Sequence, residues 1–148
     1  MNRIYFAGPL FSQAEKDYNL KLTTLLERSG YSVFLPQRDG YEAAQLKDKT
    51  PSEITQLIFQ KDTSEILKAD IFFMVLDGRV PDDGACVELG IAYSHSKRCY
   101  GVKTDVRSLE INMDINPLIS GCFNKIFCNH NGDELISELN EYLRQKSL

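Results

Sequence analysis

The stretch "DIFFMVLD" (70–77) decides how this 148-residue chain folds. Its apolar run predicts a β-strand, because uninterrupted apolar residues are typical of a central parallel strand that is covered on both faces. The next stretch, "GRVPDDGACVELGIAYSHSK" (78–97), starts with turn residues and then carries an apolar run long enough for a helix. That run reads as buried on every side, yet it holds one carboxylate, Glu88. Packing alone does not explain this charge.

Short apolar runs alternate with longer helical patterns along the rest of the chain. Four further strands are predicted at "RIYFAG" (3–8), "YSVFLP" (31–36), "RCYGVKTD" (98–105) and "NKIFCN" (124–129). Three further helices are predicted over 12–28, 52–68 and 133–146. The segment 37–51 is loop-like with room for one short helix, and 106–121 is poorly patterned.

This order predicts one α/β domain over residues 1–148. We expect a doubly wound sandwich of the Rossmann or flavodoxin type, built on a five-stranded parallel sheet. Right-handed crossovers place the loops that follow the strands along one edge of the sheet. Sheets of this kind bind their ligands at that edge.

Composition excludes several classes of protein. The chain is 43% hydrophobic and 26% charged, which is typical of a folded globular domain, and its net charge of −4 argues against binding a nucleic acid polymer. No signal peptide or membrane span is expected from the sequence. The four cysteines (Cys86, Cys99, Cys122 and Cys128) have no C-x-x-C spacing, and the two histidines (His95 and His130) have no zinc-ligand spacing, so we expect no metal site. We expect a reduced, cytoplasmic protein in which the four thiols serve packing.

Asp62 is the first polar residue that breaks the apolar pattern. Ile54, Ile58, Asp62 and Ile66 are four residues apart and share one face of the predicted helix 52–68. A carboxylate on a buried face is costly unless something pairs with it. Asp62 therefore either reaches solvent or a lysine, or it has a chemical role.

Glu88 poses the same question more sharply. Asp82 or Asp83 is a natural N-cap for the helix that follows, which puts Glu88 near the positive end of the helix dipole. Burial raises the pKa of such a carboxyl group, whereas the dipole and hydrogen-bond donors lower it. Glu88 is either a capping-type carboxylate paired with the backbone or a functional group.

Tyr5 is the third such residue. Along the first strand it points away from the face shared by Ile4 and Phe6, near the carboxyl end of the strand. A buried tyrosine hydroxyl usually has a hydrogen-bond partner. Because the first and third strands are expected side by side, their ends can bring Tyr5 and Glu88 together.

The segment "DDGACVELG" (82–90) is not a phosphate-binding loop. It lacks the G-x-G-x-x-G pattern and the P-loop lysine, and its carboxylates would repel phosphate. The expected ligand is neutral or becomes cationic, and an oxocarbenium-like transition state fits that requirement.

The chain resembles the nucleoside 2-deoxyribosyltransferases. The features that carry the resemblance are "IYFAGP" (4–9), "QKDTSEILKADIFFMVLDG" (60–78), "PDDGACVELGIA" (81–92), which is similar to the family signature D-x-G-x-x-x-E-L-G, and "INPLISG" (115–121). The resemblance implies the doubly wound fold, homo-oligomers and no cofactor. The activity that it implies is transfer of 2-deoxyribose between nucleobases through a covalent glutamyl intermediate, with retention of configuration.

The resemblance also implies roles for individual residues. Glu88 matches the nucleophile, Tyr5 the tyrosine that orients it, and Asp62 the carboxylate that handles a proton on the nucleobase. Asp82, together with the motif glycines Gly8 and Gly84, matches the substrate-binding residues. Asn116 matches an asparagine that family members lend to a neighbouring subunit's site. Partners are then a small-molecule nucleoside, a free nucleobase and further copies of the chain.

Two other functions stay open at this point. The same site would serve an N-glycosidase that hydrolyses (deoxy)nucleosides or their 5′-monophosphates. Gln37, Arg38 and Asp39 are candidates to lie near the site, and an arginine there would favour a phosphorylated substrate. The third reading is a non-catalytic nucleotide-sensing domain whose acidic residues hold Mg²⁺, although such a domain would carry its acidic pair after the first strand, where this chain has "AGP" (7–9).

Overall fold

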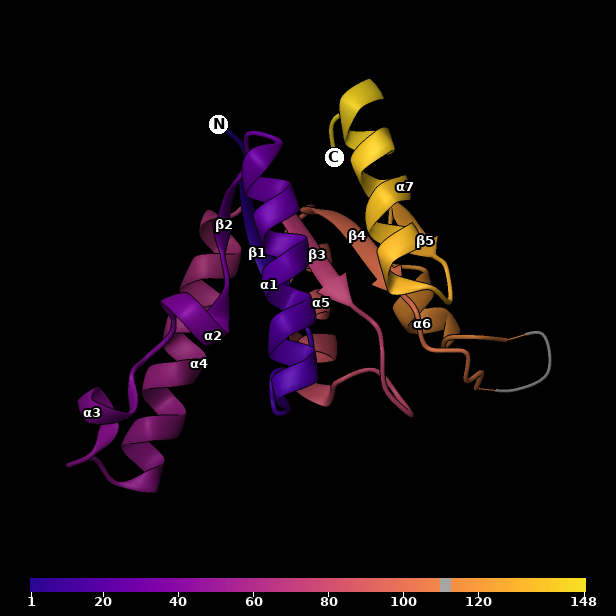
Figure 1. The fold of residues 1–148 in the computed structure, drawn as a ribbon. Coiled ribbons are helices and arrows are strands. Elements are labelled where there is room, and N and C mark those ends of the chain that lie inside the picture. The colour runs from indigo at the N-terminus through magenta and orange to yellow at the C-terminus, as the bar shows by residue number, and fades with distance from the viewer. Residues whose placement is uncertain (110–112) are drawn as a thin grey trace.

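A computed structural model describes residues 1–109 and 113–148 (Figure 1). Within these residues the chain forms one five-stranded parallel sheet with the strand order β2-β1-β3-β4-β5. The doubly wound α/β fold is confirmed, in the flavodoxin-like order whose topological switch point lies between β1 and β3. The strands are β1 (Arg3–Ala7), β2 (Ser32–Phe34), β3 (Ile71–Val75), β4 (Arg98–Lys103) and β5 (Lys125–Cys128).

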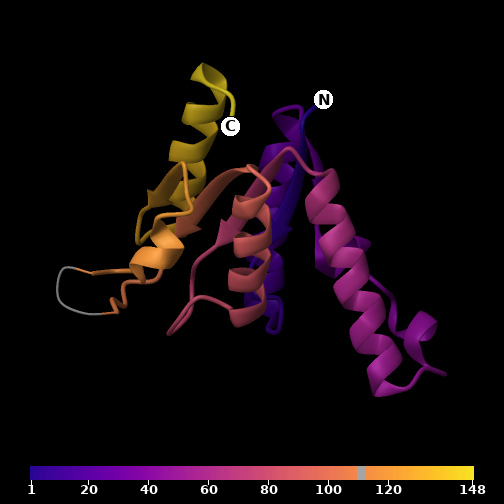
Figure 2. The same cartoon turned by 180° about the vertical axis from the view of Figure 1, so that it is seen from behind.

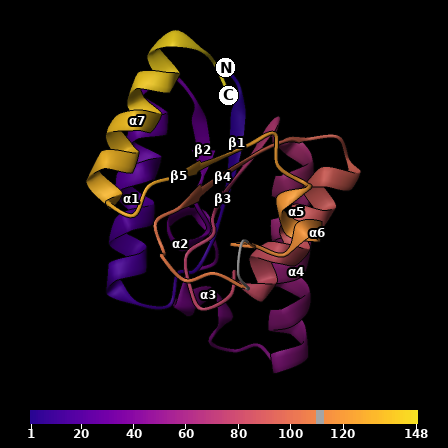
Figure 3. The same cartoon turned by 90° about the vertical axis from the view of Figure 1, so that its right-hand side faces the viewer.

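Helices cover both faces of the sheet, as the views from behind and from the side show (Figures 2 and 3). One face packs against α1 (Gln13–Arg28) and α7 (Gly132–Gln145). The other packs against α4 (Pro51–Lys68) and α5 (Asp83–Ser94), with the short helix α6 (Pro117–Ser120) at its edge. Two more short helices, α2 (Pro36–Asp39) and α3 (Ala43–Leu46), lie in the connection between β2 and α4.

Strand β3 is the centre of the core, as its apolar sequence predicts. Every residue from Ile71 to Val75 is buried, and the strand pairs with β1 on one side and β4 on the other. Alternate side chains of β1 and β3 enter two separate apolar clusters, one under α1 and α7 and the other under α4 and α5. Tyr5 belongs to the second cluster, whereas Ile4 and Phe6 belong to the first.

Local capping residues set the helix boundaries. Ser12 and Thr50 each form a capping box, with Glu15 and Glu53 respectively, so α4 begins at Pro51, one residue before the predicted start. Pro36 opens α2 and thereby shortens β2 relative to the predicted strand. The connection between β2 and α4 therefore holds two short helices where the sequence predicted one.

Two expectations about burial are wrong. Helix α5 is buried on one side only, through Ala85, Leu89 and Ala92, whereas Val87 is 60% exposed and Tyr93 is 57% exposed. One face of α5 packs on the sheet, and the described residues leave its outer face partly exposed. Cys128 is exposed at the end of the edge strand β5, so it does not serve packing as Cys99 does.

No helix in the described ranges is long and apolar enough to cross a membrane.

Candidate active site

The centre of the site is a hydrogen bond between Tyr5 and Glu88. Tyr5 is fully buried on the face of β1 that carries α4 and α5, and its hydroxyl donates to Glu88 Oε1 at 2.6 Å. The tyrosine ring is stacked between Phe34 of β2 and Phe72 of β3, at centroid distances of 5.5 and 5.8 Å. Three adjacent strands therefore fix the direction of this hydroxyl group.

Glu88 lies in the second turn of α5 and is half-buried. Burial, with smaller contributions from the charges of Asp62 and Asp82, raises the pKa of its carboxyl group to about 7, and the hydrogen bond from Tyr5 acts in the opposite direction. The helix dipole acts mainly on the first turn and so does little at this position. Tyr5 is itself held neutral, because burial and the charge of Glu88 raise the pKa of its phenol. Tyr5 is therefore the donor that an ionised Glu88 needs.

Asp62 reaches the same site from α4. The residue and Glu88 both line a cavity of about 390 Å³ between α4 and α5, whose walls are mostly aliphatic. The remaining lining residues are Ile54, Thr55, Ile58, Phe59, Thr63, Ile66, Gly84, Val87 and Ile91. The stripe that Asp62 interrupts thus faces this cavity along much of its length, and Ile66 alone among the stripe's isoleucines is fully buried.

The electrostatics of Asp62 resemble those of Glu88. Burial raises the pKa of Asp62, Lys61 lowers it and Glu65 raises it. The cavity thus holds two carboxyl groups whose protonated forms are both favoured by burial. Carboxyl groups whose pKa is raised in this way are suited to accept or deliver a proton.

The other residues suggested by the sequence lie in different places. Asp82 is the N-cap of α5, where its Oδ2 accepts from the Ala85 N–H at 2.9 Å, and Gly84 lines the cavity. Asp83 is exposed in the first turn, so the choice between the two possible caps is settled in favour of Asp82.

Gly8 and Asn116 do not line this cavity within the part of the chain that the structure describes. Gly8 has a φ of +145°, and a Cβ there would lie 2.9 Å from the Cβ of Val75, so glycine allows β1 to end close against β3. Asn116 is exposed and caps α6, where its Oδ1 accepts from the Leu118 N–H at 2.9 Å.

The three polar residues after β2 have structural contacts instead of facing the cavity. Arg38 binds Glu27, Asp39 and the carbonyl oxygen of Val33, which turns its guanidinium toward α1. Gln37 bridges Asn19 and the carbonyl oxygen of Lys16. The expectation that Arg38 favours a phosphorylated substrate therefore has no support in the structure, because its charge is already paired.

Sequence reasoning missed two charged groups at the carboxyl edge of the sheet. Asp77, at the end of β3, accepts from the backbone N–H groups of Thr104 and Asp105, which joins the loops that follow β3 and β4. Lys61, next to Asp62, reaches across to the segment that follows β2. A polar residue directly after an apolar strand is a weak signal for the first group, and no local pattern identifies the second.

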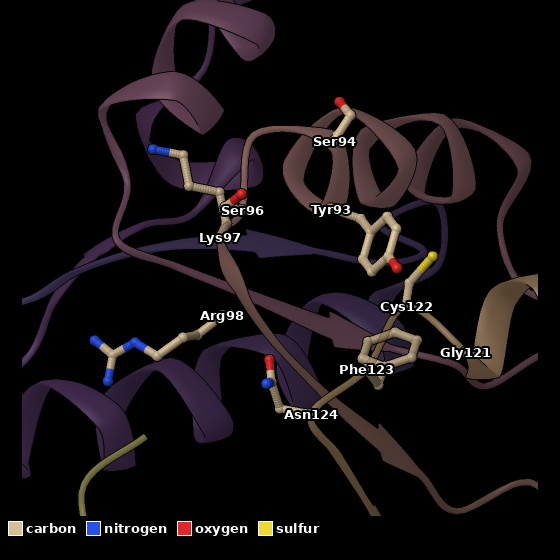
Figure 4. A pocket seen from close by; sticks show the side chains of 9 residues that line it. All are labelled: Tyr93, Ser94, Ser96, Lys97, Arg98, Gly121, Cys122, Phe123 and Asn124. Carbon is tan, nitrogen blue, oxygen red and sulfur yellow. The ribbon is translucent and has the colours of Figure 1, made fainter.

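The described residues contain no group of three or more His, Cys, Asp or Glu side chains that could hold a metal ion. A second cavity of about 510 Å³ lies at the amino end of β4, at the opposite edge from the usual ligand edge (Figure 4). Lys97 and Arg98 point away from its Tyr93 and Cys122 and bind the carbonyl oxygens of Leu67 and Leu148. The cavity of Glu88 is therefore the better candidate for an active site.

The fold and this cavity define a class of protein: a doubly wound α/β protein that places an oriented carboxylate and a second carboxyl group beside the switch point of its sheet. A sequence model of the nucleoside 2-deoxyribosyltransferases matches residues 4–141. The chain belongs to this family, which acts on small-molecule nucleosides and nucleobases.

Several solved structures share this fold. A conserved protein from Enterococcus faecalis V583 is 25% identical, with a TM-score of 0.78 and 98% of each chain covered. A 2-deoxyribosyltransferase from Bacillus psychrosaccharolyticus is 23% identical, with a TM-score of 0.74 over 95% of this chain and 91% of that one. A CMP N-glycosidase from Clostridium botulinum is 19% identical, with a TM-score of 0.63 over 95% and 99% of the two chains. No curated protein sequence matches the chain.

Proposed function

We propose that the protein transfers 2-deoxyribose between nucleobases, with Glu88 as the nucleophile. The observation that carries the proposal is the 2.6 Å hydrogen bond from a buried tyrosine to a carboxylate that lines an apolar cavity. That bond orients one oxygen of Glu88 and supplies the donor that its ionised form needs. Family membership independently supports nucleosides as the substrates.

The reaction has two displacements at C1′ of the sugar. In the first, an oxygen of Glu88 forms a bond to C1′ while the bond from C1′ to the base nitrogen breaks, and Asp62 delivers a proton to the departing base. In the second, a nitrogen of the incoming base attacks C1′, the ester bond breaks, and Asp62 takes up the proton of that base. Two inversions give net retention of configuration. The missing 2′-hydroxyl eases both steps, because no electron-withdrawing oxygen opposes the positive charge on the sugar.

Unphosphorylated nucleosides are the proposed substrates. Both charged groups that line the cavity are carboxylates, and Asp82 adds a third negative charge nearby. A 5′-phosphate would meet repulsion from these groups, and Arg38 is paired elsewhere.

Hydrolysis of the same bond is the second candidate. The rim of the cavity is exposed at Ile58, Phe59 and Val87, which lets water approach a sugar ester on Glu88. Water would then replace the second base as the acceptor. The Clostridium botulinum neighbour, named as a CMP N-glycosidase, shares the fold.

We also propose that the active form is a homo-oligomer in which Asn116 completes a neighbouring subunit's site. Asn116 is exposed and outside the cavity lining, so contact with a sugar on Glu88 requires a second copy of the chain. Mixing Glu88→Ala with Asn116→Ala tests this arrangement, because mixed oligomers regain activity only when the two residues belong to different subunits. Light scattering gives the oligomer size, and two inactive variants that stay inactive when mixed would contradict the arrangement. A cytoplasmic location stays a prediction.

The test of the function is product analysis by chromatography. The protein is incubated with a 2′-deoxynucleoside, with and without a second free base, and Glu88→Ala is the control. A new nucleoside that forms only when the second base is present supports transfer, whereas free deoxyribose without exchange supports hydrolysis. Mass spectrometry of the peptide that contains Glu88 would detect the deoxyribosyl ester. No reaction with any deoxynucleoside or its monophosphate would rule out both functions.

A further inference from the structure

Lys61 is the residue next to Asp62 on α4, and its ammonium group joins three parts of the structure. The Nζ atom donates to the carbonyl oxygen of Asp39 at 2.7 Å. It also lies 4.6 Å from the ring centroid of Tyr41 and 5.9 Å from that of Phe34. One half-buried charge therefore contacts the end of β2 and both sides of the turn at Gly40.

These contacts lead directly to the candidate nucleophile. Phe34 stacks on Tyr5, with 5.5 Å between centroids, and Tyr5 donates to Glu88. Lys61 is thus separated from the Tyr5 hydrogen bond by one aromatic ring. A shift of Phe34 away from Lys61 would loosen the stack that directs the Tyr5 hydroxyl.

The charge of Lys61 also acts on Asp62. The titratable groups that face Asp62 are Lys61 and Glu65 on α4, Glu88 on α5 and Tyr5 on β1. Burial and Glu65 raise the pKa of Asp62, whereas Lys61 lowers it. Replacing Lys61 with a neutral side chain leaves the upward shifts unopposed.

We propose that Lys61 is a positioning residue of the site, which holds the 39–41 turn and the Phe34–Tyr5 stack against α4 and keeps a positive charge beside Asp62. Lys61 is not itself among the residues that line the cavity. It acts through Phe34, Tyr5 and Asp62, and its kinetic consequences rest on the proposed function.

The test compares Lys61→Met, Lys61→Arg and the matched control Lys97→Met. Lys97 makes the same kind of contact, from its ammonium to the carbonyl oxygen of Leu67 at 2.7 Å, at the opposite edge of the sheet. Two readouts need no substrate: the pKa of Asp62 by carboxyl-carbon NMR, and the rate of tryptic cleavage at Lys47 and Lys49. The third is the pH profile of deoxyribosyl transfer.

For Lys61→Met we expect a higher pKa of Asp62, several-fold faster cleavage after Lys47 and Lys49, and a kcat/KM about tenfold to a hundredfold lower. The pH profile should move upward with Asp62. Lys61→Arg keeps the charge and the donors, so its kcat/KM and its Asp62 pKa should stay near those of the wild type. Lys97→Met should leave all three readouts unchanged.

Equal losses in Lys61→Met and Lys97→Met, or an unchanged Asp62 pKa in Lys61→Met, would overturn the proposal. A wild-type protein without transfer or hydrolysis would overturn the proposed function instead, and the NMR and cleavage readouts would still decide the role of Lys61.

Discussion

The pKa of Glu88 leads to a prediction about stability: Glu88→Gln should stabilise the fold at alkaline pH while it abolishes turnover. Burial, together with the charges of Asp62 and Asp82, raises the pKa of this carboxyl group from 4.5 to about 7. Between pH 4.5 and pH 7 the folded state therefore keeps a proton on Glu88 that the unfolded state has lost. Stability of the wild type therefore falls as the pH rises from 4.5 to about 7, and it stays lower above pH 7. Glutamine is always neutral and does not incur this loss.

The shift sets the size of the effect. A change from 4.5 to about 7 corresponds to a ceiling of about 3.5 kcal/mol, at about 1.4 kcal/mol per pH unit. Glu88 is half-buried, so screening by solvent reduces this ceiling, and we expect about 1–3 kcal/mol at pH 8. For a chain of this length that gain raises the melting temperature by roughly 2–10 °C. The carbonyl oxygen of the introduced glutamine would still accept from Tyr5, which limits the loss of the hydrogen bond.

Urea unfolding of both proteins at pH 4.5 and pH 8 measures the difference. The variant and the wild type should be equally stable at pH 4.5, and the variant should be more stable at pH 8. Asp48→Asn, at an exposed position after α3, serves as the control and should show no such pH-dependent gain. A wild type that equals or exceeds Glu88→Gln at pH 8 would refute the argument that burial controls the ionisation of Glu88.

Three further outcomes are expected. Tyr5→Phe removes the hydrogen-bond donor to Glu88, so the rise of kcat/KM with pH should shift to higher pH, and the maximum of kcat/KM should fall about tenfold to a hundredfold. An unchanged pH profile would exclude Tyr5 as the donor that lowers the pKa of Glu88. Asp82→Ala removes the N-cap of α5 and should lower the free energy of unfolding by about 1 kcal/mol, whereas Asp82→Ser should restore that stability. If substrate binding is also restored in Asp82→Ser, the role of Asp82 is helix capping alone. Arg38→Ala should lower the melting temperature but leave unchanged the ratio of kcat/KM for a deoxynucleoside to kcat/KM for its 5′-monophosphate. A changed ratio would show that Arg38 contacts the substrate.

Much of the site was predictable because its residues belong to regular elements. Parallel neighbours in a sheet have aligned carboxyl ends, so a tyrosine on β1 and a glutamate on the helix after β3 are expected to be near one another. The 2.6 Å contact of Tyr5 with Glu88 agrees with that expectation. Asp62 was detectable as a charge within an apolar stripe of helical period, and it lines the same cavity.

The remaining features depend on contacts between segments that are far apart in the sequence. Arg38 looked like a candidate phosphate ligand until its partners on α1 and β2 were known, and these lie across the fold. Lys61 gave no signal, because its contacts at Asp39, Tyr41 and Phe34 are 20 or more residues away in the chain. The outer face of α5 was expected to be buried because apolar composition does not report how many faces of a helix are covered.

The sequence by itself determined the order of strands and helices, since the apolar run of β3, the helical periods and the capping residues are local features that act within a few residues. The tertiary structure alone decided the environment of Glu88: one hydrogen-bond donor, an aliphatic cavity and a second carboxyl group at Asp62. The physical reason is that the pKa of a carboxyl group is set by desolvation and by its nearest charges and donors, and these come from β1, α4 and α5 together.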